Sequence, residues 1–247
     1  MKRFDVHATS ALAVRAAAEA FVAIASKAIQ NHGMFSVALS GGTTPRSMYK
    51  RLASKEYASR VDWSRVVACW GDERCVPPDN DESNYRMARE TLLSKVPIVP
   101  KNIHRIKGEL VPQTAADEYN DALTTLFNLE EGSFPRFDLV LLGVGDNGHT
   151  ASLFPHTAVV DEKKRLVAAP YIEELDAHRI TLTPPVLTNA AIVLFLVLGD
   201  HKAGIVQSVV ESSYEPTRYP AQLLRNASGA VTWIMDTAAA SKLTPGR

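Results

Sequence analysis

The sequence predicts an α/β protein of Rossmann-like type, with a largely parallel sheet and helices on both faces. Short apolar runs recur along the chain and alternate with stretches of helical period. These runs are nearly continuous in hydrophobic residues, which is typical of strands buried on both faces. No internal repeat, low-complexity tract or Gly/Ser linker divides the 247 residues. We therefore expect a single α/β domain over residues 1–247.

The first helix is predicted over residues 10–31, where Ala17, Phe21, Ile24 and Ala28 recur at helical spacing. Thr9 or Ser10 supplies its N-cap and Gly33 follows its end. Further helices are expected over 46–55, 83–96, 114–128 and 202–211, with a short helix at the C-terminus. In the helix over 114–128, Thr114 and Asp117 match a capping box. Strands are expected over 35–39, 66–70, 103–106, 139–142, 166–171, 179–183, 191–198 and 231–235.

Composition excludes several classes of protein. Lysine plus arginine and aspartate plus glutamate number 27 each, so no overall positive field exists to bind nucleic acid or a membrane surface. No apolar run reaches the ~18 residues of a membrane span, and the first residues lack the apolar core of a signal peptide. Cys69 and Cys75 fit neither a zinc motif nor a disulfide framework. We expect a cytoplasmic protein with no obligate protein partner evident.

A glycine-rich loop, Ser-Gly-Gly-Thr-Thr-Pro at residues 40–45, joins a predicted strand to a predicted helix. Its glycines allow the backbone to approach a ligand, and N–H groups at a helix start hold anions such as phosphate. It is not a Walker A loop, because no Gly-Lys-Ser/Thr follows. A plain tight turn with a threonine cap explains the loop equally well when it is taken alone.

Charged residues follow the strand over 66–70, in the segment Gly-Asp-Glu-Arg-Cys-Val-Pro at residues 71–77. Arg74 is suited to clamp a phosphate or a carboxylate. Asn84 and Tyr85 open the next helix and would line the same crevice. Taken alone, a run of charges is more often a solvated loop with local ion pairs.

The segment over 139–155 is the most informative in the chain. Its apolar strand, 139–142, leads directly into a glycine-rich turn that ends at His149. Ligands of open α/β sheets bind beyond the carboxyl ends of the strands, and a histidine there can move a proton at neutral pH. The Gly-x-Gly-x-x-Gly pattern at 143–148 also matches a dinucleotide fingerprint. Pro155 interrupts the helix that such a fingerprint requires, so we expect no nicotinamide cofactor.

No metal site is predicted, because the histidines lack paired ligand spacing and no carboxylate cluster accompanies them. Arg179 begins one predicted strand, and Lys202 follows another. Each is a plain surface residue when it is considered singly.

Taken together, these segments resemble the 6-phosphogluconolactonase family, which is related in fold to glucosamine-6-phosphate deaminase. The resemblance rests on residues 39–45, 70–77 with 83–85, 143–155, 179–183 and 199–202, which occur in the family's order. It implies hydrolysis of 6-phospho-D-glucono-1,5-lactone to 6-phospho-D-gluconate in the oxidative pentose phosphate pathway, without a cofactor. His149 would transfer the proton, either as the base that activates water or as the acid that protonates the ring oxygen.

The resemblance also implies how the substrate is held. Its phosphate would be bound by Ser40, Gly41, Gly42, Thr43, Thr44, Arg74, Arg179 and Lys202. Supporting roles fall to Asp72, Asn84, Asp146 and Asn147. The family often carries Asp immediately before its Gly-His pair, whereas this chain carries Asn147, which offers only a neutral hydrogen bond.

Two alternatives are a deaminase-like isomerase and a non-catalytic sugar-phosphate-binding regulator. The deaminases resembled here would place Phe-Asn-Glu-Pro after the histidine, whereas this chain has Ser-Leu-Phe-Pro at 152–155. A regulator could lose His149 and would need an effector module, which is not evident in the sequence.

Overall fold

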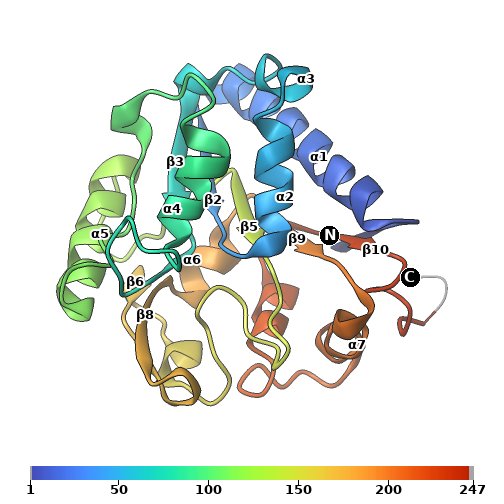
Figure 1. Cartoon of the computed structure of the whole chain (residues 1–247). Coiled ribbons are helices and arrows are strands. Elements are labelled where there is room, and N and C mark those ends of the chain that lie inside the picture. The colour runs from blue at the N-terminus through green and yellow to red at the C-terminus, as the bar shows by residue number, and fades with distance from the viewer. Residues whose placement is uncertain (1, 245–247) are drawn as a thin grey trace.

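The computed structural model describes residues 2–244, which form a six-stranded sheet flanked by helices (Figure 1). Every strand pair in this sheet is parallel. The predicted α/β class with a largely parallel sheet is therefore confirmed. In spatial order the strands are β1 (Lys2–His7), β10 (Ala230–Asp236), β9 (Ile192–Val197), β5 (Leu139–Leu142), β2 (Phe35–Leu39) and β3 (Val66–Trp70).

A second, smaller sheet is antiparallel and contains β8 (Ala177–Leu182) as its central strand. Its other strands are β4 (Asp72–Arg74), β6 (Val167–Ala168) and β7 (Tyr171–Ile172). β4 follows directly after β3, so the small sheet begins at the carboxyl end of the large one. This connection brings the charged segment after β3 beside β8.

The helices are α1 (Ser10–His32), α2 (Thr43–Leu52), α3 (Lys55–Ala58), α4 (Asn84–Ala88), α5 (Pro112–Phe127), α6 (Pro184–Asn189) and α7 (Ala203–Glu211). Both predicted caps of α1 are confirmed. Thr9 Oγ1 accepts a hydrogen bond from Leu12 N at 3.3 Å, and Gly33 ends the helix at φ 84°. Its apolar stripe is buried, with the Phe21 ring against Phe35 at 5.2 Å between centroids. No helix among residues 2–244 is long and apolar enough to cross a membrane.

Several predicted boundaries are wrong. α5 begins at Pro112, so Thr114 and Asp117 lie inside the helix and form no capping box. Proline suits the first turn, because its missing N–H has no helical partner there. α2 already begins at Thr43, and the helix predicted over 83–96 is a short α4 that continues as a π-helical turn, Arg89–Leu93.

Strand predictions fail where pairing partners are missing. Residues 103–106 form no strand, and only Ile103 bridges to Ala68. The strand predicted over 166–171 is broken into β6 and β7 around Pro170, which cannot donate to a ladder. Residues 237–242 form turns where a terminal helix was expected. The edge strand β1 and the charged strand β4 were not predicted.

Candidate active site

The carboxyl ends of three neighbouring strands of the large sheet surround one cavity of about 220 Å³. β2, β3 and β5 each end at a segment that the sequence singled out. The cavity is lined by Ser40, Gly41, Gly42, Asp72, Arg74, Asn84, Gly143, Val144, Gly145, His149 and Ala151. The fold therefore brings together residues that lie more than a hundred positions apart.

The loop after β2 places its backbone at the cavity wall. Tyr49 holds it from within α2, accepting a hydrogen bond from Ser40 N at 3.0 Å and donating to Ser40 O at 2.9 Å. Gly42 has φ 100°, a conformation that strongly favours glycine. Gly41 is equally restricted, since a Cβ there would lie 1.8 Å from Asn84 Oδ1. Thr43 and Thr44 begin α2 and do not line the cavity.

Two of the residues that line the cavity carry buried polar atoms without a partner. Ser40 Oγ and Asn84 Oδ1 have no hydrogen bond among the described residues. Leaving such an atom unpaired costs roughly 1–3 kcal/mol. An unpaired group of this kind calls for an explanation, and a bound ligand is one.

Asp72 and Asn84 form the second side of the cavity. Asn84 Nδ2 donates to Asp72 O at 2.9 Å and to Asp72 Oδ1 at 3.3 Å, and Ser152 Oγ donates to Asp72 Oδ2 at 2.7 Å. Burial raises the pKa of Asp72, although the Ser152 hydrogen bond and the charges of Arg74 and Arg179 oppose the rise. The Asp72 carboxyl group is thus held in place by Asn84, at the start of α4, and by Ser152, in the segment after His149.

Glu73 anchors this side, and the sequence analysis did not assign it a role. Its buried carboxylate accepts hydrogen bonds at 2.8 Å from the backbone N of Arg74, Asn84 and Tyr85, and one at 3.1 Å from Ser83 Oγ. It therefore caps α4 from ten residues away. No local sequence signal indicates such a cap, because capping motifs are read over three or four residues.

Arg74 and Arg179 lie opposite each other as a register pair of β4 and β8. The Arg74 side chain also donates to Glu82 O, which fixes its direction, and Arg179 Nη1 donates to His178 O at 3.1 Å. Arg74 lines the cavity, and both charges act on Asp72. The two arginines predicted to bind an anion are therefore neighbours in space.

His149 lies at the end of the turn after β5, with its ring stacked on Phe154 at 4.1 Å between centroids. The ring packs so closely on Gly145 that a Cβ there would meet its atoms at 2.0–2.7 Å. Asn147 Oδ1 lies 2.7 Å from His149 Nδ1 and accepts from His149 N at 3.1 Å. Among the described residues, the hydrogen-bonded nitrogens of His149 are its backbone N and Nδ1, so Nε2 has no partner.

The surroundings of His149 keep its ring neutral. Burial, above all, and the positive charges of Lys202 and Arg179 together lower its pKa to about 4, although the charge of Asp146 opposes them. With Nδ1 facing an amide oxygen, the hydrogen of the neutral ring resides on Nδ1. Nε2 then carries the free lone pair and can accept a proton.

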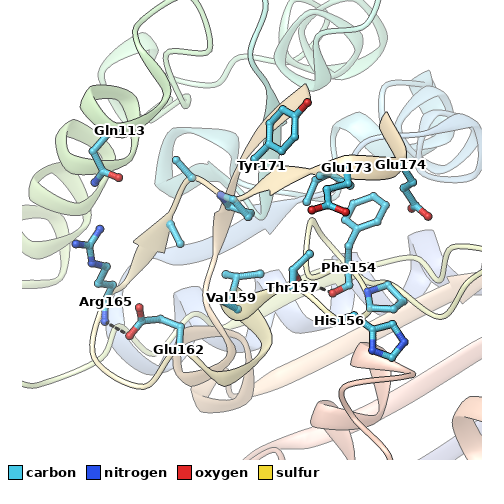
Figure 2. A pocket seen from close by; sticks show the side chains of 16 residues that line it. Gln113, Phe154, His156, Thr157, Val159, Glu162, Arg165, Tyr171, Glu173 and Glu174 are labelled. Atoms are coloured by element: carbon cyan, nitrogen blue, oxygen red, sulfur yellow. Dashed lines mark hydrogen bonds between the residues drawn. The ribbon is translucent and has the colours of Figure 1, made fainter. Parts of the chain in front are cut away.

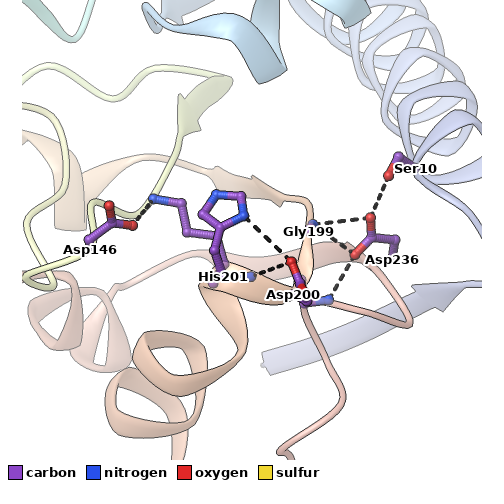
Figure 3. A network of polar contacts seen from close by, with 8 residues as sticks. Ser10, Asp146, Gly199, Asp200, His201 and Asp236 are labelled. Atoms are coloured by element: carbon purple, nitrogen blue, oxygen red, sulfur yellow. Dashed lines mark hydrogen bonds and ion pairs between the residues drawn. The ribbon is translucent and has the colours of Figure 1, made fainter.

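Lys202 lies near His149 but is already paired. Its Nζ is 2.6 Å from Asp146 Oδ1. The loop before it is held by Asp236, whose carboxylate accepts from Gly199 N and from Ser10 Oγ (Figure 3). Burial would raise the pKa of Asp236, but these hydrogen bonds outweigh it and the pKa is lowered. Lys202 does not line the 220 Å³ cavity.

Phe154, whose ring stacks on His149, also lines a larger cavity of about 650 Å³ (Figure 2). Arg165, Glu162, Tyr171 and Glu173 are among its lining residues. None of the residues predicted to form the site lines this larger cavity. Among residues 2–244, no group of three or more His, Cys, Asp or Glu side chains is arranged to hold a metal ion.

Fold and cavity together define an α/β protein with a polar ligand site at the carboxyl edge of a parallel sheet. Residues 8–233 match the family model described as glucosamine-6-phosphate isomerases/6-phosphogluconolactonase, and the chain belongs to this family. A 6-phosphogluconolactonase from Synechocystis sp. is 39% identical over 222 residues, 89% of each chain.

Solved structures agree with this assignment. The 6-phosphogluconolactonase from Trypanosoma brucei superposes with a TM-score of 0.89 at 29% identity and covers 99% of both chains. A monomeric glucosamine-6-phosphate deaminase superposes with a TM-score of 0.82 at 18% identity, covering 97% of this chain and 99% of its own. That second likeness concerns the fold alone, and it confirms the relationship in fold that the motifs predicted.

Proposed function

We propose that this chain hydrolyses 6-phospho-D-glucono-1,5-lactone to 6-phospho-D-gluconate in the oxidative pentose phosphate pathway. The observation that carries the proposal is a neutral His149 whose Nε2 is unpaired beside a polar cavity. The chain also belongs to a family in which relatives are named 6-phosphogluconolactonase, and this supports the proposed substrate.

The low pKa of His149 favours the role of base over that of acid in the first step. At pH 7 the ring is neutral, so Nε2 can take a proton from water as the water oxygen bonds to the lactone carbonyl carbon. The tetrahedral intermediate then breaks its bond to the ring oxygen. The imidazolium formed in the first step returns the proton to that oxygen, which becomes a hydroxyl. A lactone is reactive already, so positioning and one proton shuttle are sufficient.

Arg74 and Arg179 are proposed to bind the substrate's phosphate, together with Ser40 and the backbone of residues 41–44. Their support is that Arg74 and Arg179 are register partners of β4 and β8, and that Arg74 lines the same cavity as Ser40, whose Oγ is unpaired. Asn84 Oδ1 can only accept, so it suits a sugar hydroxyl and not a phosphate oxygen. Lys202 is proposed to contribute a more distant positive charge, because its Nζ is engaged by Asp146.

The deaminase alternative is disfavoured by the segment after His149. Ser152, in this segment, donates to Asp72, and the first carboxylate after the histidine is Asp161, which lies in a 3-10 turn. The regulator alternative is disfavoured by the presence of His149 in its oriented, neutral form.

We also propose a single catalytic domain working in the cytoplasm without a cofactor. The single domain is supported by the lining of the cavity, which combines the carboxyl ends of β2 and β5 with residues of β4 and α4. Support for a reducing compartment is that Cys69 and Cys75 are both free thiols.

A direct test measures lactone hydrolysis by the purified protein, after subtraction of the spontaneous rate. We expect turnover of the phosphorylated lactone and no release of ammonia from glucosamine 6-phosphate. Ammonia released at a rate comparable to lactone hydrolysis would favour the deaminase. Binding of 6-phosphogluconate with no turnover of the lactone would favour the regulator.

A further inference from the structure

Glu174 lies in a 3-10 turn, Glu173–Leu175, between β7 and β8 and 27 residues after Asn147. Its Oε1 accepts a hydrogen bond from Asn147 Nδ2 at 2.8 Å. We propose that Glu174 is a positioning residue that orients His149 through the side-chain amide of Asn147. The inference rests on the proposed function, since it concerns the same proton transfer. Figure 2 shows Glu173 and Glu174 side by side near Phe154.

The orientation of the Asn147 amide is determined from both of its ends. The backbone N–H of His149 can only donate, so it requires the amide oxygen to face inward, at 3.1 Å. The ionised Glu174 carboxylate can only accept, so it requires the amide NH₂ to face outward. Both partners thus select one of the two amide orientations.

This orientation decides which nitrogen of His149 is the base. The inward oxygen lies 2.7 Å from Nδ1 and holds the hydrogen of the neutral ring there, so Nε2 remains the acceptor. The Phe154 stack and the contact with Gly145 fix the plane of the ring. A ring turned by 180° would keep the same plane, so stacking alone does not select the nitrogen. Asn147 selects the nitrogen through its contact with Nδ1, and Glu174 holds the Asn147 amide in the orientation that makes this contact.

The charges that act on His149 are those of Lys202, Arg179 and Asp146. Glu174 reaches the ring only through the amide, because its hydrogen bond is to Asn147 Nδ2. A positioning role therefore predicts a change in tautomer and in kcat, with little change in substrate affinity.

The first experiment compares Glu174→Ala and Glu174→Gln with a matched control, Glu173→Ala, on the same turn. Partners that orient a histidine are worth roughly 10-fold to 100-fold in activity at metal sites. Glu174 contacts a neutral amide and not the histidine itself, so we expect an effect near the lower end of this range, about tenfold. Glu174→Ala should lose about tenfold in kcat with KM within twofold. Glu174→Gln keeps an acceptor oxygen and should recover most of the loss, and the control should match wild type.

The second readout is ¹⁵N NMR of the histidine rings near pH 7, with the His149 signals identified by their loss in His149→Ala. In wild type the hydrogen should reside on Nδ1 alone. Glu174→Ala should show a mixture of the two neutral tautomers, whereas the control should not. An unchanged tautomer in Glu174→Ala would overturn the proposal, whatever the effect on kcat.

A double-mutant cycle separates coupling from independent effects. Asn147→Asp would place a carboxylate against Glu174, and Glu174→Gln would then supply a donor to it. We expect Glu174→Gln to raise kcat at least fivefold in the Asn147→Asp background, although it lowers kcat slightly in wild type. Simple additivity would mean that the two side chains do not act together.

Failure of the proposed function is distinguishable from failure of this proposal. The NMR comparison needs no substrate, so it tests the role of Glu174 even if the phosphorylated lactone is not hydrolysed. Conversely, turnover by wild type with no tautomer change in Glu174→Ala would retain the lactonase and remove Glu174 from it.

Discussion

The two sides of the cavity differ in how completely their polar atoms are paired. On the side of Ser40 and Asn84, buried oxygens have no partner. On the side of His149, the ring Nδ1, both ends of the Asn147 amide and the Lys202 ammonium are all hydrogen-bonded. Unpaired atoms are suited to bind a ligand, whereas a paired network is suited to hold one reacting group in place.

The difference explains why the cations near the cavity are not equivalent. Arg74 and Arg179 are cross-strand neighbours, neither forms a salt bridge among residues 2–244, and their charges act on the buried Asp72. Lys202 neutralises Asp146, which is 80% exposed. We therefore expect an incoming phosphate to gain more from the two arginines, because Lys202 would first have to give up Asp146.

The largest expected effect tests the paired side. His149→Ala should lose about 10²–10⁴ in kcat, roughly 3–5 kcal/mol of barrier, because general acid–base catalysis is removed. It should still bind 6-phosphogluconate, whose phosphate contacts lie on the other side. Steady-state hydrolysis measures kcat, and calorimetry measures the binding of 6-phosphogluconate.

His149→Asn is the control for a purely structural histidine, since it can keep a hydrogen bond in the turn without accepting a proton. It should be nearly as inactive as alanine. Near wild-type turnover in this variant would leave positioning as the whole of catalysis.

A second prediction tests the arginine side. Arg74→Ala or Arg179→Ala should raise KM for the phosphorylated lactone by roughly 10-fold to 100-fold, as expected for the loss of a charge-assisted contact of about 1.5–3 kcal/mol. Unphosphorylated gluconolactone should be affected far less. Arg165→Ala, in the larger cavity, is the matched control. Equal losses on both substrates would argue against phosphate binding by the arginines.

Lys202→Ala should have a smaller effect, below about fivefold in KM, because Lys202 does not line the cavity and its Nζ is already engaged by Asp146. The effect is measured as KM for the phosphorylated lactone and for unphosphorylated gluconolactone. A loss as large as that of the arginine variants would place the phosphate on the lysine side and reverse the comparison.

The smallest expected effect is that of mild acid on wild type. Because a base works when unprotonated and the pKa of His149 is about 4, kcat/KM should change by less than about twofold between pH 7 and pH 5. It should fall only as pH drops through about 4. A histidine with its ordinary pKa of 6.5 would lose roughly 30-fold over that range.

The pH profile of Asp72→Asn is the control, since that carboxyl shares the cavity and its pKa is raised by burial. An inflection near pH 6.5 that persists in this variant would mean that His149 is not depressed in the working enzyme.

Local sequence patterns were sufficient to predict the fold class and the segments of the site. Apolar runs such as 35–39 and 139–142 predict buried parallel strands, and glycine, histidine and arginine after such strands predict a site at their carboxyl ends. Both inferences depend on local pattern only. The structure places Ser40, Asp72, Arg74 and His149 around one cavity without altering the predicted order of segments.

Tertiary structure alone decided how these residues are paired. Glu73 caps α4, Glu174 holds Asn147, and Asp146 engages Lys202 across 56 positions in the chain. Such contacts depend on the packing of segments distant in sequence, and no local spacing encodes them. Burial, which lowers the pKa of His149, is likewise a property of the folded surroundings. For this reason the sequence left open whether His149 acts as acid or base, whereas its environment in the fold favours the base.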